Sequence, residues 1–118
     1  MSLPEPIGPY SIYREAGDFI FISGQIGIDY EKGVIPESIE EQTELVLKNI
    51  KNILESLNLT FDNVIKSTIF LKDINDFQKV NEIYSKYFNK PYPARSTVEV
   101  SALPKNAKVE IEIVAFKG

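Results

Sequence analysis

Few side chains in this sequence can do chemistry, and two arginines stand out among them. The 118 residues contain no His and no Cys. Nucleophilic sites built on Ser-His or Cys-His pairs, and metal sites built on imidazole or thiolate, are therefore excluded. Any chemistry must use carboxylates, amines, guanidinium groups, phenols, hydroxyls, amides or the backbone. Arg14 and Arg95 are the only arginines among 13 basic residues.

Arg95 is a candidate for binding an organic acid. A guanidinium group can bind a carboxylate through two parallel hydrogen bonds, and it stays charged when it is partly buried. Pro93-Ala94 precedes it at the start of a predicted strand, so its position is rigid. The alternative is a surface arginine paired with a nearby glutamate, and the pattern leaves both interpretations open.

Glu110 and Glu112 are candidates for acid–base chemistry. They share one face of the last predicted strand, where they alternate with apolar residues. A carboxylate in a strand of buried type is costly unless it is paired or faces a cavity, and burial raises its pKa toward the range of a general base or acid. The alternative is a half-solvated strand face. Glu99, on the neighbouring strand, is interpreted as structural.

Three further positions place polar groups, or a glycine, in apolar surroundings. Asn81 shares a helical stripe with Phe77 and Tyr84, so its amide either bonds to a sheet edge or contacts a ligand in a pocket. Ser23-Gly24-Gln25 interrupts an apolar strand, which indicates either close approach of a ligand or a bulge. Tyr10 offers a phenol to a pocket or is a half-buried strand aromatic. No phosphate-binding loop, dinucleotide motif or zinc spacing is present.

Strands must position most of these residues. Alternation predicts strands at residues 10–15, 19–26, 64–71, 95–102 and 108–116. With two helices between them, the order is β-β-α-β-α-β-β, an α+β fold with the helices on one face of a mixed sheet. The length fits a single domain over residues 1–118. In the third strand, alternation places Ile65, Ser67, Ile69 and Leu71 on one face.

Capping signals and apolar periodicity predict the two helices. The first begins at the N-cap Ser38, which has a glutamate three residues later, and runs to about Leu57, where Asn58 is a left-handed cap. The second carries an apolar stripe that extends to Phe88, and the prolines in residues 90–93 end it. Its possible caps are Asp73, Asn75 and Asp76.

Composition and charge narrow the class of protein. The sequence is 43% hydrophobic and 25% charged, which is typical of a globular domain. A net charge of −4 argues against a general nucleic-acid or anionic-membrane binder. The N-terminal sequence lacks the basic and apolar regions of a signal peptide, and no apolar run has the length of a membrane helix. We therefore expect a cytoplasmic protein with no nucleic-acid or membrane partner.

Two strands are apolar on both faces, which bears on assembly. Residues 19–26 and 109–116 both follow this pattern. A strand buried on both sides needs cover on both sides, and two helices can cover only one face of the sheet. The other face must curl on itself or meet another subunit, and we expect an oligomer.

Together these segments resemble the reactive intermediate deaminase family, also called RidA or YjgF. The resemblance covers nearly the whole chain and is most specific near the C-terminus. Its N-terminal and central segments are Ile7-Gly8-Pro9-Tyr10-Ser11, Ile22-Ser23-Gly24-Gln25-Ile26, Asp73-Ile74-Asn75-Asp76-Phe77 and Val80-Asn81. Its C-terminal segments are Pro93-Ala94-Arg95-Ser96-Thr97-Val98-Glu99-Val100, Leu103-Pro104 and Val109-Glu110-Ile111-Glu112.

The resemblance implies a chorismate-mutase-like fold and a homotrimer with active sites in the clefts between subunits. It implies hydrolysis of reactive enamine and imine acids, such as 2-aminoacrylate, 2-iminopropanoate and 2-iminobutanoate, to 2-keto acids and ammonia, with no metal and no cofactor. On the family's motif, Arg95 binds the substrate carboxylate and Glu110 handles the attacking water. The matching pocket positions are Tyr10, Ser23, Gly24, Asn81 and Thr97. Thr97 departs from a frequent Cys, at a contact made largely through the backbone.

Two other functions compete with this interpretation. A non-catalytic trimer that binds 2-keto acids would keep Arg95 and would not need Glu110. RNA cleavage has been attached to relatives, but the charge of −4 and the absence of His disfavour it.

Overall fold

Five strands form one mixed sheet in the order β1-β2-β5-β3-β4, in a computed structural model that describes residues 3–118. The first two residues of the predicted domain lie outside this range. Adjacent strands are antiparallel except β3 and β4, which are parallel. The strands are β1 (Tyr13–Ala16), β2 (Phe19–Ile26), β3 (Val64–Leu71), β4 (Ala94–Glu99) and β5 (Val109–Phe116). The last strand of the sequence therefore lies at the centre of the sheet.

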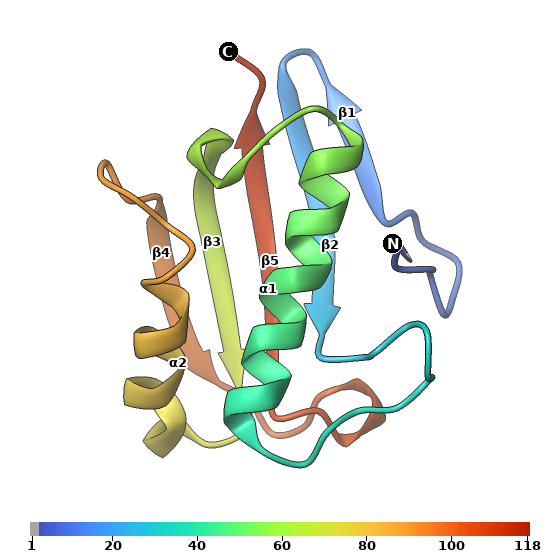
Figure 1. The fold of residues 1–118 in the computed structure, drawn as a ribbon, viewed down its shortest axis with the longest axis vertical. Coiled ribbons are helices and arrows are strands. Elements are labelled where there is room, and N and C mark those ends of the chain that lie inside the picture. Colours follow the sequence, from blue (N-terminus) through green and yellow to red (C-terminus); the bar gives the residue numbers. More distant parts are fainter. Residues whose placement is uncertain (1–2) are drawn as a thin grey trace.

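Both helices lie over the same face of the sheet (Figure 1). α1 (Ile39–Ser56) packs on β2 and β5, and α2 (Phe77–Tyr84) packs beside α1. The predicted α+β order is confirmed. Between these layers, apolar side chains of the central strands and of α1 form the core, including Ile20, Ile111, Ile113, Leu47 and Ile50.

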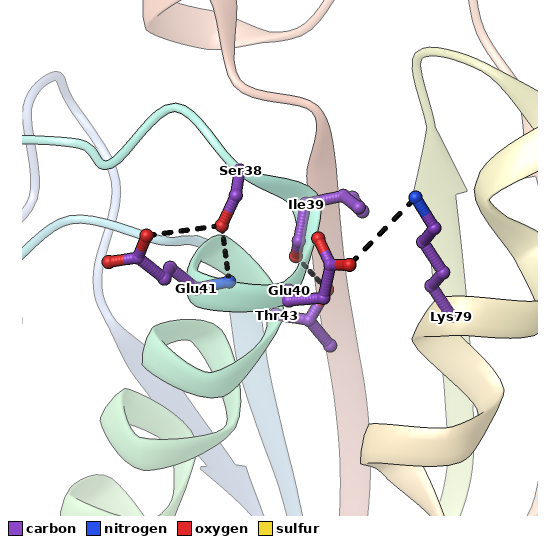
Figure 2. Close-up of polar contacts among 6 residues, drawn as sticks. All are labelled: Ser38, Ile39, Glu40, Glu41, Thr43 and Lys79. Atoms are coloured by element: carbon purple, nitrogen blue, oxygen red, sulfur yellow. Dashed lines mark hydrogen bonds and ion pairs between the residues drawn. The ribbon is translucent and has the colours of Figure 1, made fainter.

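α1 begins and ends where the sequence predicts. The Ser38 hydroxyl accepts a hydrogen bond from the Glu41 backbone N–H at 3.0 Å and lies 3.3 Å from the Glu41 carboxylate (Figure 2). Asn58 follows the helix with φ 61°, the left-handed cap. Figure 2 also shows Lys79 of α2 paired with Glu40 at 3.8 Å. Both ends of that ion pair are exposed, so it contributes little to stability.

Three predicted boundaries are wrong. α2 ends at Tyr84 because the next backbone bonds tighten to i→i−3, and Phe88 follows the helix. The first strand begins at Tyr13, since Tyr10 lies in a turn that its own N–H closes onto the Gly8 carbonyl at 2.8 Å. β4 ends at Glu99, because its parallel partner β3 ends at Leu71.

Two irregularities change which way side chains point. In β2, Ile22 and Gln25 pair with Ile113 and Ile111, so Ser23-Gly24 form a bulge with one extra residue. A register shift also follows Val64 in β3. There Val64 is 4% exposed and Ile65 is 43% exposed, whereas Ser67 is fully buried, so the prediction that Ile65 shares a face with Ser67 is wrong.

The sheet face turned away from the helices is uncovered in the single chain. Phe19, Phe21, Val98 and Phe116 expose between 37% and 49% of their surface there. Phe19 and Phe116 pack on each other with ring centroids 5.1 Å apart. No helix within residues 3–118 combines the length and apolar character required to cross a bilayer.

Candidate functional site

Arg95 lies on the helix-covered face of edge strand β4. It pairs in register with Ser67 of β3, whose side chain is fully buried. The guanidinium carbon is 5.0 Å from the centroid of the Tyr84 ring and 5.6 Å from that of Phe77. The ion pairs within residues 3–118 do not include Arg95. The structure therefore does not contain the surface Arg–Glu pair that was the alternative interpretation.

A cavity of about 330 Å³ opens beside this guanidinium. We call it the Arg95 cavity; its lining residues are Asn81, Tyr84, Ser85, Tyr92, Pro93 and Arg95. Asn81 thus lines the cavity beside the guanidinium, as a contact with a ligand requires, and that contact stays a prediction. Thr97 lies two residues further along the same face of β4, and its buried hydroxyl oxygen has no hydrogen-bond partner in the described part of the chain.

Glu110 lies on the opposite face of the sheet, in the central strand β5, between Ile26 of β2 and Phe70 of β3. Its side chain is half-buried. Burial raises the pKa of the Glu110 carboxyl above its usual value, and the nearby charge of Glu112 raises it further. Glu112 is exposed. Glu112 therefore fits the interpretation of a half-solvated strand face. Glu110 fits the interpretation of a partly desolvated carboxylate.

A small hollow of about 30 Å³ lies against Glu110. Such a volume has room for a water molecule. We call it the Glu110 hollow, and Tyr10, Gly24, Gln25 and Tyr30 contribute to its lining. A Cβ atom at position 24 would lie 2.7 Å from the carboxyl carbon of Glu110, so glycine there leaves room for the carboxylate.

Ser23 joins the N-terminal segment to this bulge. Its hydroxyl donates to the Ser11 carbonyl at 2.6 Å, and its backbone N–H donates to the Ile12 carbonyl at 2.8 Å. The phenol oxygen of Tyr10 accepts from the Ile7 backbone N–H at 3.3 Å. The Ser23 bonds thus hold the segment that carries Tyr10 close to Glu110.

The predicted site residues therefore form two groups, separated by the sheet. The first group, Asn81, Arg95 and Thr97, lies on the helix-covered face. The second group lies on the opposite face and consists of Tyr10, Ser23, Gly24 and Glu110. One chain alone does not bring Arg95 and Glu110 to a common cavity.

Sequence reasoning missed several aromatic residues around Arg95 and Glu110. Phe77 and Tyr84 were recognised as members of an apolar helical stripe, Tyr92 falls in residues 90–93, which end the second predicted helix, and Tyr30 was not singled out. For Phe77 and Tyr84 the available signal was a helical stripe of aromatic residues that comes shortly before the strand carrying Arg95. Nowhere in residues 3–118 do three metal-ligating side chains gather, and the expectation that no metal or cofactor is needed stays a prediction.

Comparison with known proteins defines the class first. The family model described as "Endoribonuclease L-PSP" matches residues 1–117. The chain is 50% identical over 113 residues to the chloroplastic Reactive Intermediate Deaminase A of Arabidopsis thaliana. The match covers 95% of this chain and 60% of that protein.

Two solved structures from E. coli share the fold. The YjgF gene product has a TM-score of 0.93 at 40% identity, and TdcF with bound serine has 0.92 at 39%. Each match covers 98% of this chain and 94% of the other. The chain belongs to the reactive intermediate deaminase (RidA/YjgF) family, and the YjgF-like fold implied by its motifs is confirmed.

Proposed function

We propose that this protein is a deaminase that hydrolyses small imine and enamine acids, such as 2-aminoacrylate, 2-iminopropanoate and 2-iminobutanoate, to 2-keto acids and ammonia. The observation that carries the proposal is the state of Arg95. Its cation is half-buried against two aromatic rings beside the Arg95 cavity, with no ion pair in residues 3–118. Its hydrogen-bond donors are therefore available to a ligand's carboxylate.

The relatives support the same chemistry. The deaminase of Arabidopsis is 50% identical, and the similar TdcF was solved with serine, which carries a carboxylate next to an amino-bearing carbon. A 2-imino acid has a carboxylate in the same position relative to its imine carbon. One guanidinium can therefore anchor either molecule.

Glu110 supplies the proton transfers in the proposed mechanism. An enamine acid first tautomerises to the imine. Glu110 accepts a proton from a water molecule as the water oxygen bonds to the imine carbon and the C=N double bond becomes single. Glu110 then returns that proton to the nitrogen. The resulting carbinolamine then transfers its hydroxyl proton to nitrogen, the C–N bond breaks, and ammonia and the 2-keto acid leave. A carboxyl with a raised pKa suits a group that both accepts and returns a proton.

The proposed site lies between two copies of the chain in a homotrimer. Arg95 and Glu110 lie on opposite faces of one sheet, so a site that uses both must take them from different copies. The uncovered face with Phe19, Phe21 and Phe116 offers the apolar surface for such packing.

The test follows the decay of an imine produced by a pyridoxal-phosphate dehydratase, with and without this protein. Wild type should speed the decay. Arg95→Ala should lose both turnover and pyruvate binding, whereas Glu110→Gln should lose turnover and keep pyruvate binding. Lys79→Ala is the matched control, because Lys79 is exposed on α2 and pairs only weakly with Glu40. A wild type that binds pyruvate without speeding the decay contradicts catalysis and supports a binding module.

The same preparations test the activity named in the description of the family model. With a net charge of −4 and no His, we expect no salt-dependent affinity for RNA and no cleavage of it. Cleavage that Glu110→Gln abolishes would contradict the deaminase as the function of this site.

A further inference from the structure

Aromatic rings contact the Arg95 guanidinium where proteins often place a carboxylate. Its central carbon lies 5.0 Å from the Tyr84 ring centroid and 5.6 Å from the Phe77 centroid. A cation within about 6 Å of a ring centroid is attracted to the negative face of the ring. Phe77 and Tyr84 are seven residues apart in α2, about two helical turns, so their side chains project from the same side of the helix.

Tyr84 is fixed at both ends. Its ring stacks on Phe88 with centroids 4.2 Å apart, and its phenol oxygen lies 2.7 Å from the hydroxyl oxygen of Ser67. Ser67 is fully buried and is the register partner of Arg95 across β3 and β4. The hydrogen bond therefore attaches the helix that carries both rings to the strand next to Arg95. The position of the ring relative to the guanidinium is set by the core.

This arrangement has a consequence for ligand binding. A protein carboxylate would fix the guanidinium but would also occupy its N–H donors and offset its charge. Ring faces attract the cation without accepting its strong in-plane hydrogen bonds. Packing against rings thus limits the motion of the side chain and leaves its donors for a ligand.

We propose that Phe77 and Tyr84 are positioning residues that hold Arg95 ready to bind the carboxylate of a small organic acid. The inference rests on the proposed function only in taking Arg95 as the group that binds this carboxylate. It assigns a role to two residues that the deaminase mechanism itself does not use.

The first test measures pyruvate affinity and steady-state imine hydrolysis in Phe77→Leu and Tyr84→Leu. Removing one cation–π contact should raise the pyruvate Kd and the KM about three- to tenfold and leave kcat nearly unchanged. Phe77→Tyr keeps a ring face and should restore both values. Phe61→Leu is the matched control, because Phe61 packs on Tyr87 and Phe88 and makes no cation–π contact with Arg95. Equal losses in Phe61→Leu and Phe77→Leu would overturn the proposal.

The second test does not depend on turnover. The chain has two arginines, so a sample labelled only at arginine gives two sets of side-chain NMR signals, and Arg95→Lys identifies one of them. Ring currents should shift the Arg95 side-chain protons upfield in wild type, and Phe77→Leu and Tyr84→Leu should each reduce that shift. An unshifted Arg95 signal would overturn the proposal whatever the enzyme assay shows. A shifted signal in a protein without deaminase activity would leave the positioning role supported and the proposed function contradicted.

Discussion

At the scale of single residues, two carboxylates of the same strand differ in their exposure to water. Glu110 and Glu112 share a face of β5, but only Glu110 is half-buried, beside the bulge at Ser23-Gly24. Gly24 allows this placement because its missing side chain leaves the space that the Glu110 carboxylate occupies. A loss of water raises the pKa of one carboxyl, while its neighbour stays in solvent.

Replacing Gly24 should therefore impair the site more than the fold. In Gly24→Ala the new Cβ would lie 2.7 Å from the Glu110 carboxyl, a flexible side-chain end that can move aside. We expect a drop of tenfold or so in kcat/KM, which corresponds to about 1.4 kcal/mol, with a small change in Tm. Steady-state kinetics and thermal unfolding measure the two effects.

Gly27→Ala is the matched comparison. A Cβ at position 27 would lie 2.6 Å from the Gln42 backbone carbonyl oxygen at the start of α1, which cannot move aside cheaply. This variant should lose Tm clearly. If Gly24→Ala loses as much Tm as Gly27→Ala, the special role of Gly24 at Glu110 is contradicted.

The pH dependence of the reaction should report the Glu110 environment. In the proposed mechanism Glu110 accepts a proton from water, so its ionised form is the active one. A raised pKa then moves the acid limb of kcat/KM above pH 4.5, the ordinary value for glutamate. Removing the second cause of the shift with Glu112→Gln should move that limb to lower pH. Rates over a pH series, corrected for uncatalysed hydrolysis, measure it. An acid limb that ignores Glu112→Gln contradicts the proposed role of the Glu112 charge.

At the scale of elements, polar contacts join α1 to the turn that follows α2. The Tyr87 hydroxyl donates to the Glu44 carboxylate at 2.8 Å. Burial and Glu44 together raise the pKa of Tyr87 to about 12. Lys86 lies 3.6 Å from the same carboxylate. The turn after α2 is thus attached to the N-terminal half of α1.

Tyr87→Phe should loosen this attachment and leave the chemistry intact. A hydrogen bond to a charged group contributes about 1.5–3 kcal/mol to the free energy of unfolding, and the partial exposure of Glu44 places the expected loss at the low end. Chemical denaturation measures the loss, and Tyr13→Phe, on the exposed edge strand β1, is the control. Because Tyr87 contacts neither site residue group, kcat/KM should stay at the wild-type value, and a large drop in it would show that this turn also positions the Arg95 cavity.

Periodicity and capping residues determine how much of the fold can be predicted. Ser38 and Asn58 define the two ends of α1. The Ser38 side chain caps the first turn, and the Asn58 backbone adopts the left-handed conformation that ends the helix. Both effects depend on the local sequence and not on the packing of other elements. The bulge at Ser23-Gly24 and the shift after Val64 depend on which strand lies alongside. Ile65 was assigned to the wrong face for that reason, because one extra residue inverts the alternation.

The candidate site shows the same division. Residue types and motifs were enough to select Arg95 and Glu110 as candidates, and their roles stay predictions. Their placement on opposite faces follows from β5 pairing between β2 and β3, a non-local arrangement that no local pattern encodes. The contacts of Arg95 with Phe77 and Tyr84 depend on how α2 docks on β4, which is also non-local.

At the scale of the whole molecule, the single chain leaves one sheet face bare and its site residues divided between two faces. Exposed phenylalanines on a sheet are unfavourable in water. Packing of copies in a closed ring would cover this face and bring the Arg95 of one copy to the Glu110 of the next. The proposed homotrimer has about three times the chain mass of 13.4 kDa, which light scattering measures.

Mixed assemblies give the sharpest test of a shared site. Arg95→Ala and Glu110→Gln, each inactive alone, should regain activity when they are unfolded together and refolded at equal amounts. With random mixing, about one quarter of the interfaces would pair an intact Arg95 with an intact Glu110, because each residue is intact in half of the chains. The control mixes wild type with the Arg95→Ala/Glu110→Gln double variant in the same way, which yields about the same quarter of intact sites. If that control is active and the mixture of single variants remains inactive, the two residues do not act across an interface, and the shared site is contradicted.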